Sequence, residues 1–140
     1  MDKEFTRRKL ALLLKHLNEL RSLIPIGLDE YKANFERRYA VERLIEIVVE
    51  YAIDINNYII ETCDALPSQT YYDSFIKLAE WKVIPESLAA RLASTTGLRN
   101  RLVHNYEKVR HDIVYYSLKP LVRNYQRYGL LVEKYLEKQP

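Results

Sequence analysis

Residues 29–62, DEYKANFERRYAVERLIEIVVEYAIDINNYIIET, decide the fold class. Apolar side chains recur along this stretch in steps of three and four residues, the spacing that places them on one side of an α-helix. They are Tyr31, Phe35, Val41, Leu44, Ile45, Val48, Ala52, Ile55 and Ile59. Pro25 and Gly27 end the segment before it, and Asp29 is expected to cap it. The stretch therefore predicts one long helix with a buried face.

The same spacing predicts further helices on both sides of this one. The predicted helices cover residues 2–24, 29–62, 71–81, 85–104 and 112–136. Pro85 stands in a first helical turn, Asp112 can cap the last helix, and Pro120 is expected to kink it. With only 3 glycines and 5 prolines among 140 residues, the chain has few places to turn, which nearly excludes a sheet of many hairpins. We therefore expect an all-α, four- to five-helix antiparallel bundle, in one domain over residues 1–140.

The charge balance is mildly basic. Lys and Arg number 22 against 19 Asp and Glu, for a net charge of +3, which permits phosphate-bearing partners without requiring them. The N-terminal residues MDKEFTRRKL contain no apolar stretch of signal-peptide length, and no run approaches the ~18 apolar residues of a membrane span. A single cysteine, Cys63, forms no intramolecular disulfide. These features predict a cytoplasmic protein without a membrane segment.

Two common kinds of site find no support in the sequence. The chain has no Cys-x-x-Cys or His-Glu-x-x-His motif, and its histidines lie on different predicted elements without close ligand spacing. Its glycines are isolated from one another, so no glycine-rich loop is available to cradle a phosphate. We expect no metal and no cofactor.

Four acidic residues follow one another at four-residue steps along the predicted helix 29–62. They are Glu42, Glu46, Glu50 and Asp54. Because arginines occur among them, a solvated, ion-paired face is the expectation rather than a cation site. Asp54 is the exception, since it lies beside apolar residues and could face an arginine of another helix.

The segment with the most chemical content is residues 97–106, GLRNRLVHNY. The ring of His104 can exchange a proton near neutral pH, and the guanidinium of Arg99 can hold a phosphate through two parallel hydrogen bonds. Asn100 and Tyr106 can orient both groups. Together they form a set suited to phosphoester chemistry without a metal.

Helical geometry sets a condition on this set. Asn100 and His104 are four residues apart and share a face, whereas Arg99 and His104 are five apart, about 140° around the axis. Arg99 therefore reaches the histidine's site through its length, through loosening of the helix near His104, or from a second subunit across a two-fold axis. The alternative is that His104 only caps the helix C-terminus and that Arg99 is solvated.

Arg99, four residues, His104, one residue and Tyr106 together resemble the R-x4-H-x-Y signature of HEPN-domain proteins, specifically of the HepT-like toxin family. The similarity extends to residues 39–54, YAVERLIEIVVEYAID, and to residues 75–106, FIKLAEWKVIPESLAARLASTTGLRNRLVHNY. The form Gly-Leu-Arg-Asn-x-Leu-Val-His-x-Tyr after a Pro-Glu helix start makes the resemblance specific.

The resemblance implies a HEPN-like helical homodimer that acts as a metal-independent ribonuclease. It also implies that the chain is the toxin of a toxin–antitoxin pair, with an MNT-type nucleotidyltransferase as antitoxin. In this family's pattern Arg99 and His104 are catalytic, Asn100 supports them, and Tyr106 is the residue to which the antitoxin attaches AMP. The family also contains proteins thought only to bind nucleotides or to act as a scaffold for a minimal nucleotidyltransferase, which is the alternative function.

Overall fold

The computed structural model describes residues 1–63 and 66–140, which form six α-helices, one short 3-10 helix and no β-strand. The elements are α1 (Lys3–Ser22), α2 (Leu28–Ala33), α3 (Phe35–Thr62), α4 (Tyr71–Glu80), α5 (Glu86–His104), the 3-10 helix η1 (Tyr106–Lys108) and α6 (His111–Glu137). The all-α prediction is confirmed. No helix in the described part of the chain is both long and apolar enough to cross a membrane.

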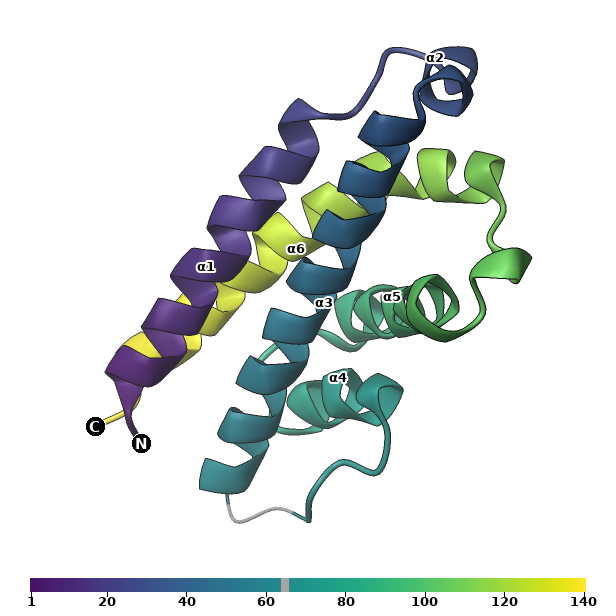
Figure 1. The fold of residues 1–140 in the computed structure, drawn as a ribbon. Helices are drawn as coiled ribbons and strands as arrows, with labels where there is room; N and C mark the ends of the chain where they lie inside the picture. The colour runs from purple at the N-terminus through teal and green to yellow at the C-terminus, as the bar shows by residue number, and fades with distance from the viewer. Residues whose placement is uncertain (64–65) are drawn as a thin grey trace.

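The long helix α3 is the centre of the arrangement (Figure 1). It runs antiparallel to α1, and α6 packs against α1. The shorter helices α4 and α5 pack on each other and on α3, while α2 contacts α3 and α6 at the opposite end. Both chain ends lie together, at the end of the molecule away from α2 (Figure 1). Helix α5, which carries the R-x4-H segment, is therefore supported by α3, α4 and α6.

The apolar face predicted for residues 29–62 forms much of the core. Its members from Val41 to Ile59 are fully buried apart from Leu44, which is partly buried. Phe35 is the exception, because it begins α3 at the surface, remains 57% exposed and lies against the ring of Tyr39. Phe35 is therefore the one member of the predicted face that lies at the surface, since Tyr31 before it is also fully buried.

The predicted single helix over residues 29–62 is wrong at one point. Asn34 has an extended backbone conformation, and its side chain accepts a hydrogen bond from the backbone N–H of Arg37 at 3.0 Å. An asparagine that bonds a nearby backbone N–H in this way ends one helix and caps the next. Asp29 is therefore not the cap; it lies in the first turn of α2, whose N-cap is Gly27.

The other helix bounds agree with the predicted ones to within two residues. Asp112 lies in the first turn of α6 instead of at its N-cap, which is Arg110. An acidic side chain there still interacts favourably with the positive end of the helix dipole. Pro120 lies inside α6, and Figure 1 shows that helix bending along its length. Proline has no N–H for the preceding turn, which accounts for a bend.

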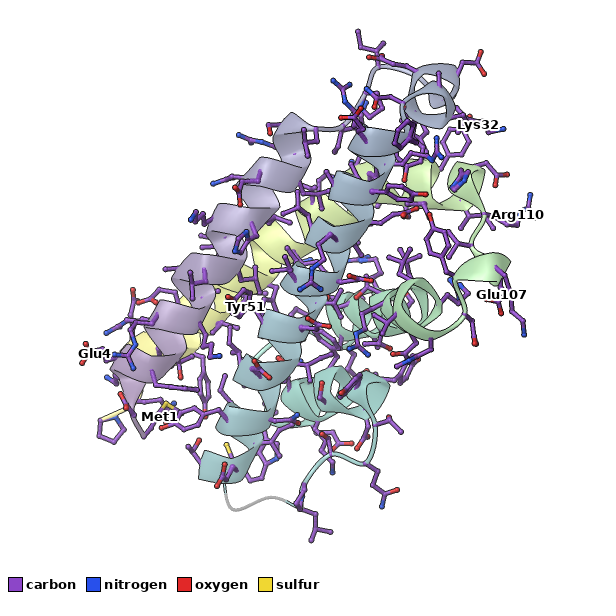
Figure 2. The ribbon with its side chains drawn as sticks, in the orientation of Figure 1. Met1, Glu4, Lys32, Tyr51, Glu107 and Arg110 are labelled. Atoms are coloured by element: carbon purple, nitrogen blue, oxygen red, sulfur yellow. The ribbon has the colours of Figure 1, made fainter. Side chains whose placement is uncertain are left out.

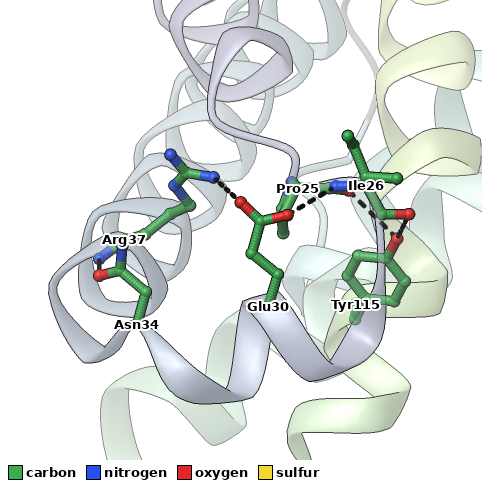
Figure 3. A network of polar contacts seen from close by, with 6 residues as sticks. All are labelled: Pro25, Ile26, Glu30, Asn34, Arg37 and Tyr115. Atoms are coloured by element: carbon green, nitrogen blue, oxygen red, sulfur yellow. Dashed lines mark hydrogen bonds and ion pairs between the residues drawn. The ribbon is translucent and has the colours of Figure 1, made fainter.

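A polar network ties the segment between α1 and α2 to α6 (Figure 3). The hydroxyl of Tyr115 donates to the carbonyl oxygens of Pro25 at 3.1 Å and Ile26 at 2.9 Å. Glu30 accepts from the backbone N–H of Ile26 at 3.4 Å and from the guanidinium of Arg37 at 3.2 Å. The short helix α2 is thereby held against both α3 and α6.

A second polar network lies inside the core, between α3, α4 and α6. The amide of Asn56 donates to the hydroxyl of Ser74 at 3.1 Å and accepts from the hydroxyl of Tyr128 at 2.6 Å. All three side chains are fully buried. A buried donor or acceptor that loses its partner is costly, so this network fixes how the three helices pack.

Tyr128→Phe should destabilise the fold by about 1 to 3 kcal/mol, because it leaves the Asn56 oxygen buried without its donor. Tyr116→Phe on the same helix is the matched control, since Tyr116 is 67% exposed and its loss should change stability by less than about 0.5 kcal/mol. Urea unfolding followed by circular dichroism measures both. Equal midpoints for the two variants would contradict a structural role for the network.

Candidate active site

The predicted catalytic residues lie in the last two turns of α5. Helix α5 ends with His104, and the backbone N–H of Asn105 still donates to the carbonyl of Arg101 at 3.0 Å. The helix therefore does not loosen before the histidine. Tyr106 begins the 3-10 turn that follows, as expected for a residue just beyond the helix end.

One cleft of about 670 Å³ brings three of the four predicted site residues together, and Tyr106 is not among the residues that line it. Arg99, Asn100 and His104 all line it from α5. The remaining lining residues are Asn57 of α3, Ser68, Gln69, Thr70 and Tyr71 from the start of α4, and Arg101 and Asn105. A single chain thus places the arginine and the histidine on one cleft.

Arg99 is held from three sides. Its Nε and Nη2 donate to one carboxylate oxygen of Glu50 at 3.3 and 2.9 Å, and its Nη1 donates to Oδ1 of Asn100 at 3.1 Å. The guanidinium also lies over the ring of Tyr71, 5.2 Å from the ring centroid. The arginine side chain is only 13% exposed. The guanidinium is therefore held in one orientation by Glu50, Asn100 and Tyr71.

Glu50 is a residue of the site that the sequence interpretation missed. Steps of four residues advance about 40° around a helix, so the acidic row on α3 turns across several environments instead of keeping one solvated face. Asp54, which could have faced an arginine, pairs with Lys9 at 3.5 Å, and Glu50 pairs with Arg99 instead. This rotation of the acidic row around the helix was the feature of the sequence that could have indicated different partners for its members.

Glu42 also departs from the expected solvated face. The residue is only 4% exposed, and burial raises the pKa of its carboxyl. It accepts a hydrogen bond from the Tyr106 hydroxyl at 2.8 Å. Burial, followed by this hydrogen bond and the Glu42 charge, raises the pKa of Tyr106 to about 12.

His104 differs from Arg99 in having no partner within the described part of the chain. The ring is exposed on the cleft and takes part in no hydrogen bond or ion pair there. His104 lies in the last turn of α5, where a cationic ring would also interact favourably with the helix dipole, but its ring nitrogens are not engaged in a side-chain cap. Its ring nitrogens are available for proton transfer.

The segment that follows the cleft is open to solvent. Tyr106 is 39% exposed, and Figure 2 shows Glu107 and Arg110 at the outer edge of the molecule, on the connection between α5 and α6. The described residues contain no group of three or more His, Cys, Asp or Glu side chains placed to hold a metal ion. The candidate site consists of an oriented arginine and an exposed histidine on the cleft, with Tyr106 on the turn that follows α5, where it contacts Glu42.

Known proteins share both the sequence and the fold. The chain is 32% identical to the tRNA nuclease HepT of Aphanizomenon flos-aquae (strain 2012/KM1/D3), over 91% of this chain and 87% of that protein. It is 26% identical to the mRNA nuclease HepT of Shewanella oneidensis, over 86% and 90% of the two chains.

Among solved structures, the fold matches the tri-AMPylated Shewanella oneidensis HEPN toxin in complex with MNT antitoxin. The TM-score is 0.86 at 24% identity, over 96% of this chain and 98% of that one. A toxin–antitoxin structure with AMP-PNP also gives 0.86, at 23% identity over 94% and 98% of the chains. The model of the family described as ribonuclease HepT-like matches residues 13–128. The chain therefore belongs to the HepT-like ribonuclease family.

Proposed function

We propose that this chain is the toxin of a toxin–antitoxin system, an RNA endonuclease that works without a metal ion. The observation that carries the proposal is the cleft in which Arg99, oriented by Glu50 and Asn100, lies with a free His104. Membership of a family with relatives named tRNA and mRNA nucleases supports it. The domain would be the whole of residues 1–140, acting in the cytoplasm, where its RNA substrate is found.

The reaction is a transesterification. The ribose 2′-oxygen forms a bond to the adjacent phosphorus, the bond from phosphorus to the 5′-oxygen breaks, and the 2′-hydroxyl proton leaves. His104 accepts this proton, a proton from water reaches the departing 5′-oxygen, and Arg99 stabilises the extra negative charge on the phosphorane oxygens. The products are a 2′,3′-cyclic phosphate and a free 5′-hydroxyl.

The held arginine still has donors for a phosphate. Arginine carries five N–H groups, and three of them are engaged by Glu50 and Asn100, which leaves two for phosphate oxygens. The ion pair with Glu50 fixes the orientation of the guanidinium and leaves these two N–H groups to donate hydrogen bonds to phosphate. Such preorganisation is what makes a cation effective in a transition state, because no reorientation is needed during the reaction.

Arg99→Ala and His104→Ala should each reduce RNA cleavage by roughly 10² to 10⁴, the range for a positioned catalytic group. Cleavage of transfer RNA and of a messenger transcript, followed on gels in the presence of EDTA, measures the loss. Arg127→Ala and His16→Ala are matched controls, since both residues lie on other helices away from the cleft.

Two results would contradict this mechanism. One is full cleavage by Arg99→Ala or His104→Ala, and the other is loss of wild-type activity in the chelator. A protein that cleaves neither RNA but still binds the nucleotidyltransferase would instead fit the non-catalytic scaffold.

A homodimer is the second part of the proposal. The geometry of one chain does not demand a second copy, because Arg99 and His104 already line one cleft. Support comes from large apolar side chains that are exposed at and beside the cleft, a feature typical of protein interfaces. They are Tyr71, Tyr72, Val103 and Tyr106. Two copies that cover these residues would join their clefts across a two-fold axis.

Light scattering coupled to size exclusion should give twice the 16.7 kDa mass of one chain. Val103→Glu should shift the protein toward the monomer, because it places a charge in the buried centre of the interface. A wild-type monomer with full nuclease activity would contradict the proposed homodimer in which two clefts join.

The third part is control by a nucleotidyltransferase of the MNT type, which attaches AMP to Tyr106. The tyrosine lies two residues beyond His104, on an exposed turn. The new phosphodiester would bring a negative charge beside the basic cleft, where it competes with RNA for Arg99. The adenosine would add bulk at the cleft entrance, so inhibition requires no refolding.

Incubation with the partner nucleotidyltransferase and Mg-ATP should raise the mass of the chain by one or more AMP units and abolish RNA cleavage. Tyr106→Phe should gain no AMP and should stay active. The exposed tyrosine variant Tyr116→Phe should behave as wild type. Mass spectrometry gives the outcome. AMP on Tyr106→Phe, or AMP on Tyr106 with cleavage unchanged, would contradict this control.

A further inference from the structure

Buried polar atoms without a hydrogen-bond partner gather at one place in the described part of the chain. They are the Tyr31 hydroxyl, Arg38 Nε, Glu42 Oε2 and His111 Nδ1. His111 Nδ1 lies 4.0 Å from Glu42 Oε2, and the rings of Tyr31 and His111 are 6.4 Å apart. Arg38 precedes Glu42 by one turn of α3, and its charge acts on both Glu42 and Tyr31. Tyr31, Arg38 and His111 therefore lie around the Glu42 carboxylate.

The same carboxylate contacts the tyrosine that the proposed function assigns to modification. Glu42 Oε1 accepts the hydrogen bond from the Tyr106 hydroxyl at 2.8 Å. Glu42 is 4% exposed and Tyr106 is 39% exposed, so the pair connects the buried cluster with the surface. The other oxygen of Glu42 faces the imidazole of His111, at the start of α6. Tyrosine, glutamate and histidine thus form a chain of polar groups from three elements.

Attachment of AMP to this tyrosine needs a base. The pKa of Tyr106 is raised to about 12, so only a fraction on the order of 10⁻⁵ of the phenol is ionised at pH 7. A neutral phenol is a poor nucleophile, and enzymes activate such groups with a base in hydrogen-bond contact. Burial raises the pKa of Glu42 above its usual range, which makes it a stronger base than an exposed carboxylate.

We propose that Glu42 takes the phenol proton when Tyr106 reacts with ATP, so that the modified chain supplies a catalytic group for its own modification. The inference rests on the proposed function, in which Tyr106 is the acceptor of AMP. The tyrosine oxygen forms a bond to the α-phosphorus of ATP, and the bond from that phosphorus to the oxygen bridging to the β-phosphate breaks. Pyrophosphate leaves with the electron pair of that bond, and the phenol proton passes to Glu42 Oε1.

The test variant is Glu42→Gln, which keeps an oxygen to accept the hydrogen bond but cannot take the proton. The rate of AMP incorporation by the partner nucleotidyltransferase with Mg-ATP should fall by roughly 10² to 10⁴. Glu42→Asp keeps a carboxylate one methylene shorter and should lose less. Glu61→Gln is the matched control, since Glu61 is exposed in the last turn of α3, away from the Glu42–Tyr106 pair, and should leave the rate unchanged. Circular dichroism melts verify that each variant is folded.

The pH profile separates a base from a merely structural contact. The wild-type rate should fall as the pH drops through the pKa of Glu42, because a protonated carboxyl cannot accept the phenol proton. The Glu42→Gln rate should instead keep rising with pH, as the phenol itself ionises. The charged and titratable groups that face the Glu42–Tyr106 pair are Tyr31 on α2, Arg38, Tyr39 and Glu46 on α3, and His111 on α6.

Three results would overturn the assignment. Equal rates of AMP incorporation for Glu42→Gln and wild type would show that Glu42 is not the base, while the proposed function would still stand. A slow Glu42→Gln variant that keeps the wild-type pH profile would show that the contact is only structural. Absence of AMP on wild-type Tyr106 would overturn both this inference and the proposed control by the nucleotidyltransferase.

Discussion

The pair between Glu50 of α3 and Arg99 of α5 is the interaction on which the site depends. It crosses the contact between the central helix and the helix that carries the catalytic segment. The guanidinium is mostly buried, and a buried charge needs a partner that is itself well placed. The partner is well placed because α3 is fixed along its length by the packing of α1, α2, α4 and α5. The packing of the core therefore also sets the position of Arg99.

Much of the fold follows from apolar spacing alone. The residues of α3 that recur in three- and four-residue steps are those that the core needs, and prolines and polar residues mark most helix ends. The apolar spacing did not predict the break at Asn34, because an asparagine within an apolar pattern is compatible with a helix. Only its backbone conformation shows that it caps α3. The hydrogen bond accepted by the Asn34 side chain therefore outweighs the apolar spacing that continues across the break.

The residues of the candidate site also differ in whether the sequence could predict their contacts. Arg99, Asn100, His104 and Tyr106 are close in sequence, so their approach to one another follows from one helix and the turn after it. Glu50 and Glu42 come from α3, 49 and 64 residues away from the groups that they bind. Their roles depend on how two helices cross, which no spacing within either helix specifies. The acidic row marked them as candidates and could not assign partners.

The unequal anchoring of Arg99 and His104 bears on how such a nuclease loses its activity in evolution. Removal of the arginine leaves the Glu50 carboxylate without its ion-pair partner. The histidine has no partner in the described part of the chain, so its loss leaves no group uncompensated. Loss of His104 should therefore cost the fold less stability than loss of Arg99, so selection against toxicity should remove the histidine more readily. Descendants that keep only a binding role should more often retain the arginine and its glutamate than the histidine.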